Sequence, residues 1–265
     1  MKTFHTNFFT LFYVALLIVI SGSLQHARAA DPATEAAPVL VELFTSEGCS
    51  SCPPADAWLE QVDRTQPFPG MQLVVLSEHV DYWNHDGWKD PFSSSIFTER
   101  QTEYVHALGL NTAYTPQVIV NGTTELHVND AQQVARAMQG IAASGVSVRI
   151  SSIQFDGANP PTLRAHVDIN GHLSQRKADV FVVLALDHAE SQVTHGENGG
   201  RHLSHVAVAQ QLTKIGRLEK EKNFSQDIQV RLKGSLDASK TRVIVFVQEP
   251  GPGKVLGAAL GKTGK

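Results

Sequence analysis

The 265-residue sequence predicts an α/β fold, a mixed sheet with flanking helices, followed by an antiparallel β-sandwich-like domain. Between residues 39 and 143, apolar strand-like runs alternate with helix-compatible segments, as expected for strands joined by helical crossovers. After Gly145, apolar residues recur at every second position in short segments that turn-rich loops separate. We therefore place a domain boundary near residue 145.

The first 29 residues have the layout of a secretory signal peptide. Lys2 precedes an apolar run at residues 8–20, and Ala27-Arg28-Ala29 provides a small-residue cleavage site before Ala30. A membrane anchor is the alternative, but the run is short for a bilayer span of about 20 residues. The sequence therefore predicts a periplasmic or secreted protein with no membrane segment in its mature form.

The mature composition argues against nucleic-acid binding. The chain has 22 Lys and Arg, and removal of Lys2 and Arg28 with the signal peptide leaves 20 against 26 Asp and Glu. The resulting net charge of −6 is mixed along the chain, without a long basic run. We expect a protein or peptide partner instead.

The first domain, residues 30–145, shows local signals for each of its elements. Asn121-Gly122 between two β-like runs predicts a tight hairpin, because a type I′ turn needs two residues that tolerate positive φ. Gly109 is a typical residue at the end of a helix. The expected elements are strands at 38–44 and 71–76, helices at 55–64 and 94–108, hairpin strands at 117–120 and 123–127, and a helix capped by Asn129 or Asp130.

The second domain, residues 146–265, is predicted to be almost entirely β-structure. One short segment, residues 212–222, looks helical. The expected strands lie at 146–150, 163–169, 178–186, 206–208, 228–232 and 243–247.

The only two cysteines form the motif Cys49-Ser50-Ser51-Cys52, between the first strand and the first helix. A C-x-x-C pair between a strand and a helix start is typical of thioredoxin-like redox proteins, and the element order up to residue 143 is that of the thioredoxin fold. The helix N-terminus would stabilise a Cys49 thiolate as nucleophile, and a more buried Cys52 would resolve the mixed disulfide. A structural zinc site would need further ligands. An inert, permanently closed disulfide is the other alternative.

Thr115-Pro116 and Glu42 are the further candidates for the redox site. Proline directly before a strand marks its start or a special turn. The corresponding thioredoxin proline is cis, faces the dithiol and shapes the groove for a substrate peptide. Glu42 lies in the otherwise apolar first strand and could move the proton of the resolving cysteine if buried beside it. A Glu42 that faces solvent is the alternative reading.

The segment at residues 79–92 is rich in aromatic and polar residues. In the functional interpretation, this segment is a lid or binding surface beside the dithiol, and Tyr82, Trp83 and Trp88 offer flat contact area. For most of the segment we favour packing of the aromatic residues over the domain junction. Two histidines and an aspartate near its start have a spacing that could hold a metal, but we assign no metal ligand.

In the second domain, the segment at residues 196–205 combines glycines with Glu, Asn, Arg and His. Capture of copper or zinc together with the nearby histidines is one interpretation of this segment. We favour a loop that an Arg–Glu pair fixes and that docks against the first domain.

Four motifs together resemble the bacterial secreted family catalogued as DUF1223. They are VELFTSEGCSSCPPAD at 41–56, HVDYWN at 79–84, TPQV at 115–118 and GENGGR at 196–201. The resemblance spans nearly all of the mature chain and implies a thioredoxin-like domain in an exported bacterial protein, without supplying a function. The chain departs from ordinary thioredoxins at Gly48, where an aromatic residue is usual, and at Ser50-Ser51.

The leading hypothesis is an exported thiol–disulfide oxidoreductase that acts on a protein or peptide thiol or disulfide without a cofactor. In this hypothesis Cys49 attacks, Cys52 resolves, Pro116 and Glu42 assist, and Thr115, Ser50, Ser51, Tyr82 and Trp83 contact the substrate. One alternative is a copper or other metal handling protein that uses the two cysteines and a histidine. Another is a redox-inert binding module with a structural disulfide.

Overall fold

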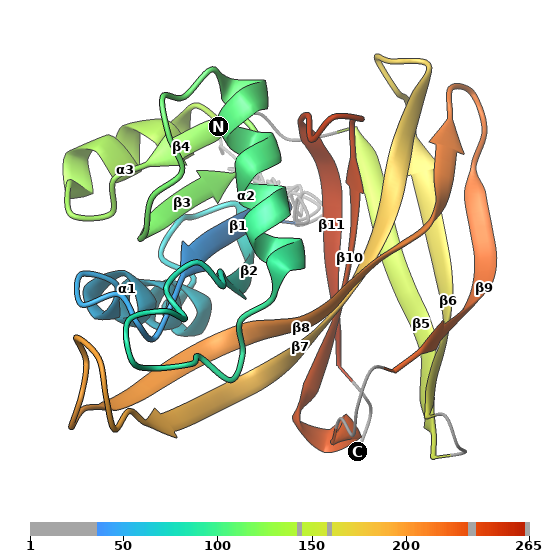
Figure 1. Cartoon of the computed structure of the whole chain (residues 1–265). Helices are drawn as coiled ribbons and strands as arrows, with labels where there is room; N and C mark the ends of the chain where they lie inside the picture. Colours follow the sequence, from blue (N-terminus) through green and yellow to red (C-terminus); the bar gives the residue numbers. More distant parts are fainter. Residues whose placement is uncertain (1–35, 142–144, 158–160, 233–236, 263–265) are drawn as a thin grey trace, which may run out of the picture. The chain divides into compact units, whose positions relative to one another are not determined.

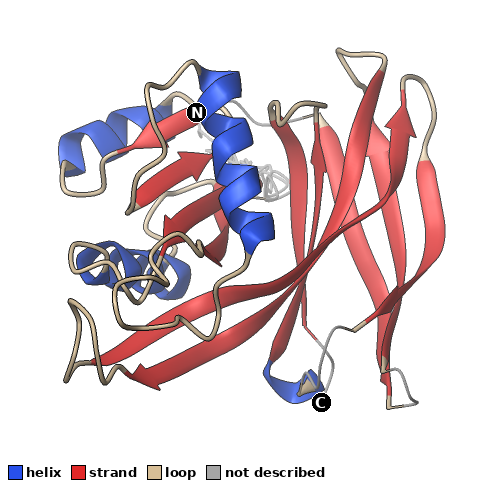
Figure 2. Ribbon diagram, viewed as in Figure 1, coloured by secondary structure: helices blue, strands red, loops and turns tan. Residues whose placement is uncertain are grey.

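The computed structural model describes residues 36–141, 145–157, 161–232 and 237–262. The predicted signal peptide lies outside these residues. The described part is a mixed α/β structure in which eleven strands form two sheets, accompanied by three α-helices and one short 3₁₀ turn (Figures 1 and 2). The α/β class is therefore confirmed.

The elements before residue 142 follow the predicted order. Ser94 caps the second helix by accepting a hydrogen bond from the Ile96 amide, and Gly109 ends it with a φ of 64°. Asn121 and Gly122 have φ angles of 46° and 70°, as the predicted hairpin requires. The elements are β1 Ala37–Thr45, α1 Pro53–Thr65, β2 Met71–His79, α2 Ser95–Leu108, β3 Gln117–Val120, β4 Thr124–Leu126 and α3 Ala131–Gln139.

The elements after residue 145 are strands, joined by a 3₁₀ turn at Ala238–Lys240. The predicted helix at 212–222 is wrong, because β8 continues as a strand through Glu219. Its backbone pairs with β7 along this stretch, and this ladder outweighs the local helix propensity. The strands are β5 Val146–Asp156, β6 Thr162–Gly171, β7 Lys177–Gln192, β8 His202–Glu219, β9 Phe224–Arg231, β10 Thr241–Gln248 and β11 Val255–Lys262.

The larger sheet has eight strands in the order β11-β10-β7-β8-β2-β1-β3-β4. It is larger than the sequence predicts, because strands from both sides of residue 145 join it. β1 and β2 are parallel, and β2 meets β8 in parallel through the pair Ser77 and Val208. The described residues belong to one compact unit.

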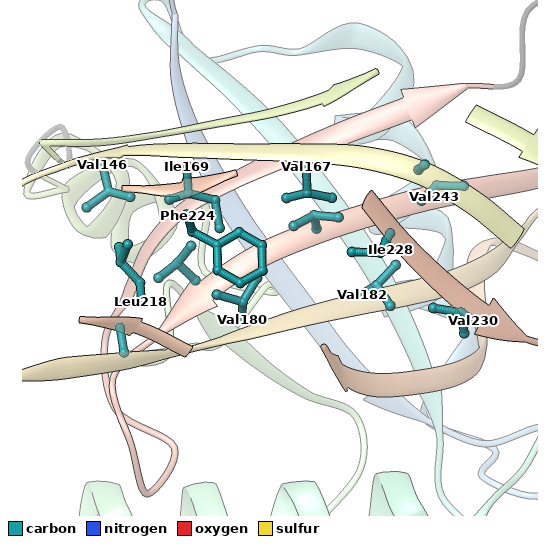
Figure 3. Packing of buried hydrophobic residues seen from close by; sticks show 14 of the residues in the cluster. Val146, Val167, Ile169, Val180, Val182, Leu218, Phe224, Ile228, Val230 and Val243 are labelled. Atoms are coloured by element: carbon teal, nitrogen blue, oxygen red, sulfur yellow. The ribbon is translucent and has the colours of Figure 1, made fainter. Parts of the chain in front are cut away.

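Three groups of apolar contacts position the elements. α1 and α3 cover the face of β1 that carries Val41 and Leu43, whereas Phe97 of α2 packs against the opposite face. The three-stranded sheet β5-β6-β9 faces β7 and β10 across a separate apolar core that includes Val167 and Val182 (Figure 3). The long β7–β8 hairpin runs from this core towards α1 (Figure 1).

Candidate functional site

The two cysteines form a disulfide in the loop between β1 and α1. The S–S distance is 2.13 Å and the Cα atoms lie 5.5 Å apart. Cys52 is the N-cap of α1, and Pro53 and Pro54 occupy the first turn, where a missing backbone N–H leaves no unpaired donor. The structure thus confirms that the cysteine pair stands at the N-terminus of a helix that follows the strand β1.

Both cysteines are fully buried, with 0% of either residue exposed. This differs from the expectation of an accessible Cys49 and a more buried Cys52. Ser50 and Ser51 between them are exposed, and the Ser51 hydroxyl lies 3.4 Å from the Cys49 sulfur. The loop therefore presents its serines to solvent and turns its sulfur atoms inward.

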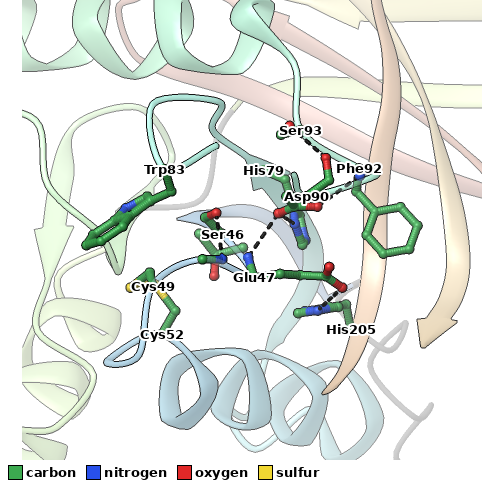
Figure 4. A network of polar contacts seen from close by, with 12 residues as sticks. Ser46, Glu47, Cys49, Cys52, His79, Trp83, Asp90, Phe92, Ser93 and His205 are labelled. Atoms are coloured by element: carbon green, nitrogen blue, oxygen red, sulfur yellow. Dashed lines mark hydrogen bonds and ion pairs between the residues drawn. A yellow bond between two sulfur atoms is a disulfide. The ribbon is translucent and has the colours of Figure 1, made fainter. Parts of the chain in front are cut away.

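Trp83 connects the disulfide loop to Thr115 (Figure 4 shows Trp83 beside Cys49). Its indole N–H donates to the Thr115 hydroxyl at 2.8 Å, and the Thr115-Pro116 peptide bond is cis. A Cβ atom at Gly48 would lie 2.9 Å from the Trp83 Cβ. Trp83, Thr115 and Pro116 are all half-buried, so this side of the loop has a partly exposed rim.

Tyr82 points to a different neighbour. Its hydroxyl donates to Gln101 on α2 at 3.2 Å, and burial raises its pKa. The structure thus brings Trp83 and Thr115 together with the disulfide loop and directs Tyr82 towards α2.

Glu42 is buried but lies on the face of β1 opposite α1. Its neighbours Val41 and Leu43 pack towards α1, so the Glu42 side chain faces α2. There Arg100 lies 2.6 Å from its carboxylate and the Tyr104 hydroxyl donates to it at 2.6 Å. Glu42 thus stabilises a buried ion pair rather than lying beside the sulfurs.

Sequence reasoning missed a buried polar cluster that Glu47, Asp56 and His205 form (Figure 4 shows Glu47 and His205). His205 Nε2 lies 3.4 Å from Glu47 and Nδ1 lies 3.5 Å from Asp56, distances that fit ion pairs better than hydrogen bonds. Burial alone would lower the pKa of His205, but the two carboxylates outweigh it and raise the pKa to about 10. An imidazolium therefore lies between them at neutral pH.

The sequence could have indicated only some members of this cluster. Asp56 follows Cys52 by four residues, so the two side chains share one face of the helix, one turn apart. Glu47 lies in the loop itself, where the Trp88 indole donates to it at 2.8 Å. His205 comes from β8, and nothing in the sequence links it to the cysteines.

The histidines of the 79–92 segment have partners within the protein. His79 Nδ1 lies 2.7 Å from Asp90, and both side chains are buried. Burial opposes ionisation of Asp90, but His79 and two backbone N–H groups hold the pKa of Asp90 below its usual value. Within the described ranges, no group of three or more His, Cys, Asp or Glu is arranged to hold a metal ion.

The loop between β7 and β8 docks onto the disulfide loop, as expected, but through different contacts. Asn198 is fully buried and donates to the carbonyl oxygens of Glu47 at 2.8 Å and Cys49 at 3.0 Å. The Ser50 amide donates to Glu197 at 3.1 Å, and hydrogen bonds from the Ser50 side chain and from this amide lower the pKa of Glu197. Arg201 donates to the Asn198 side chain at 2.9 Å rather than pairing with the glutamate.

The profile of the family described as "Protein of unknown function (DUF1223)" matches residues 40–248, which include the disulfide loop and the β7–β8 hairpin. The chain belongs to this family. Among curated proteins none matches.

The crystal structure of protein AGR_C_4864 from Agrobacterium tumefaciens is similar to this DUF1223 protein. It has 28% sequence identity and a TM-score of 0.67, and the match covers 86% of this chain and 95% of that one. A weaker match to a β-glucosidase from Kluyveromyces marxianus has 13% identity and a TM-score of 0.22, covers 48% of this chain and 14% of the enzyme, and supports no inference. No helix in the described part of the DUF1223 protein is long and apolar enough to cross a membrane.

Proposed function

We propose that this DUF1223 protein is an exported, thioredoxin-like thiol–disulfide oxidoreductase that acts on a protein or peptide partner. The observation that carries the proposal is the Cys49–Cys52 disulfide at the N-terminus of α1, linked through Trp83 to the cis Thr115-Pro116 bond. The order of β1, α1, β2, α2, the β3–β4 hairpin and α3 supports the thioredoxin-like assignment.

The proposed exchange transfers two electrons in two steps. In the reduced protein the Cys49 thiolate attacks a partner disulfide, which forms a Cys49–partner bond and releases one partner thiolate. Cys52 loses its proton and attacks Cys49, which closes the intramolecular disulfide and releases the second partner thiolate. The Cys52 proton and one proton from solvent pass to the released thiolates, so the partner is reduced and the cysteine pair is oxidised. The reverse sequence oxidises a partner dithiol.

Three local features favour this chemistry. The positive end of the α1 helix dipole stabilises a thiolate in the preceding loop. The Asp56 carboxylate lies one helical turn from Cys52 and is positioned to affect its deprotonation. The exposed Ser50-Ser51 pair and the half-buried Thr115-Pro116 segment offer backbone to an approaching peptide.

A trapping experiment tests the proposal. Reduced Cys52→Ser protein, mixed with a peptide that contains one disulfide, should accumulate a mixed disulfide at Cys49, detected by intact mass. Cys49 should also react with iodoacetamide at neutral pH. Cys49→Ser is the matched control and should form no such adduct. A Cys52→Ser variant that traps no peptide and resists alkylation would overturn the proposal.

The burial of both sulfurs favours one second candidate, a binding module whose disulfide is structural. In that case the pair should stay oxidised in excess dithiothreitol while the fold is intact. Reduction under native conditions, followed by reoxidation without loss of structure, supports the oxidoreductase instead.

A further inference from the structure

We propose that the tip of the β7–β8 hairpin, residues 193–201, is a clamp that holds the disulfide loop in its buried conformation, and that releasing it exposes Cys49. The proposal rests on the proposed function, because it explains how a buried disulfide can exchange with a partner. The clamp controls the rate at which a thiol reaches the Cys49 sulfur. It takes no part in the exchange of sulfur–sulfur bonds.

The clamp holds the backbone of the loop directly. The Asn198 side chain has no exposed surface and donates to two carbonyl oxygens of the loop, those of Glu47 and Cys49. Glu197 accepts a hydrogen bond from the amide of Ser50. These three hydrogen bonds therefore fix the backbone on both sides of Cys49.

The tip fits the surrounding loops closely on its other side. Gly196 has a φ of 76°, and a Cβ atom there would lie 2.9 Å from the Asp86 carbonyl oxygen. Trp88 in the same loop donates to Glu47. The disulfide loop is thus held between the hairpin tip and the 79–92 segment, and both sulfurs are covered.

The tip can separate without disrupting an apolar core. Apart from Val193 and Asn198, its residues are exposed, and the tip is the end of a two-stranded hairpin. On opening, the tip loses the hydrogen bonds that Asn198 donates and Glu197 accepts, together with the packing of Gly196 against Asp86 and Trp88. Local opening of such hydrogen-bonded tips requires less free energy than global unfolding.

Opening matters because exchange requires a thiolate to approach one sulfur in line with the S–S bond. In the first step an external thiolate bonds to Cys49, the S–S bond breaks, and Cys52 leaves as a thiolate. A second external thiol then releases Cys49, so two thiols become one disulfide and the pair is reduced. With both sulfurs at 0% exposure, this approach is blocked until the loop turns.

The rate of reduction by excess dithiothreitol at neutral pH tests the clamp. In Asn198→Ala the rate, followed by acid quench and alkylation, should rise about tenfold or more, because two hydrogen bonds to the loop are lost. Asn121→Ala is the matched control, since Asn121 is also a buried asparagine that binds backbone, at the Leu40 amide. Leu40 lies towards the opposite end of β1 from the disulfide loop, so this variant should keep the wild-type rate.

A second variant guards against misfolding of Asn198→Ala. Arg201 is exposed and holds only the Asn198 side-chain oxygen, so Arg201→Gln should fold normally and accelerate reduction several-fold. Equal reduction rates in Arg201→Gln and wild type would overturn the clamp. Equal acceleration in the Asn121→Ala control would also overturn it, because the effect would then reflect general destabilisation.

The same variants separate the clamp from the proposed function. If Asn198→Ala is reduced faster but its reduced Cys49 does not react with a disulfide peptide, the clamp stands and the oxidoreductase function fails. If the peptide reacts at the same rate with and without Asn198, the function stands and the clamp fails.

Discussion

Gly48 immediately precedes the first cysteine, at a position where ordinary thioredoxins carry an aromatic residue. In this protein the aromatic residue comes from elsewhere, because Trp83 packs against Gly48 and leaves no room for a side chain there. The sequence shows the missing aromatic, but it cannot show that a residue 35 positions later takes up the space. The sequence therefore shows which residue stands before the first cysteine, but not why a glycine is needed there.

Gly48→Ala should therefore destabilise the protein. The added Cβ would meet the Trp83 Cβ at 2.9 Å, and overpacking of this kind costs about 1–3 kcal/mol. Gly157→Ala is the control, because no atom of the described residues lies within 4 Å of its Cβ position. The free energy of unfolding in urea checks the pair. Equal stabilities would show that Trp83 moves freely away from the loop.

Glu42 and Glu78 are two buried carboxyl groups that both lie close to Arg100, and their side chains can be compared by substitution. Burial and the neighbouring Glu42 raise the pKa of Glu78 well above its usual value, whereas Glu42 forms the close ion pair with Arg100. Glu42→Gln should destabilise the protein by about 3 kcal/mol, since it leaves a buried guanidinium poorly paired. Glu78 lies farther from Arg100, at 3.5 Å, and burial disfavours its charged form, so Glu78→Gln should cost less than about 1 kcal/mol. Unfolding free energies at pH 7 that reverse this order would contradict Glu42 as the main partner of Arg100.

The β7–β8 hairpin is the element that the sequence predicts least well. The prediction recognised the Gly-rich segment as a docking loop, since glycine, asparagine and charged residues gather there. It missed the length of β8 and the role of His205, because strand pairing and contacts over about 150 residues leave no local pattern. By contrast, Asn121-Gly122 and Gly109 act within their own turns, and those elements were predicted correctly.

His205 makes the docking of this hairpin depend on pH. Its folded pKa of about 10 exceeds the unfolded value of 6.5, so the folded state binds the proton more tightly. The stabilisation is fully present below pH 6.5 and disappears as the pH rises towards 10. The difference in urea midpoint between wild type and His205→Gln should therefore shrink between pH 6 and pH 10. A difference that stays constant would mean that His205 is neutral in the folded protein. His85→Gln, an exposed site, is the control.

At the scale of the whole molecule, the two sequence regions share one sheet through β2 and β8. The sequence predicts both regions separately and shows the change in pattern at residue 145. It cannot show that β8 joins the edge of β2, because that contact rests on a parallel pairing between distant residues. The same joining brings Asn198 and His205 to the disulfide loop, so the site depends on both regions.

This shared sheet predicts a single unfolding transition. All three tryptophans precede residue 145, so their fluorescence reports on the first region, whereas amide hydrogen exchange in the strands β5 to β11 reports on the second. Because the described residues form one compact unit, the two signals should change at the same urea concentration. Two separate midpoints would indicate the independent domains that a boundary near residue 145 implies.

The most direct measurement for the whole protein is a redox titration of the Cys49–Cys52 pair. The protein is equilibrated with glutathione buffers of defined thiol-to-disulfide ratio, and the oxidised fraction is read by quenched alkylation and intact mass. We expect a reversible two-electron curve, reached from both directions, with native circular dichroism throughout. A pair that remains oxidised at every ratio and in excess dithiothreitol, in wild type and in Asn198→Ala alike, would contradict a redox role.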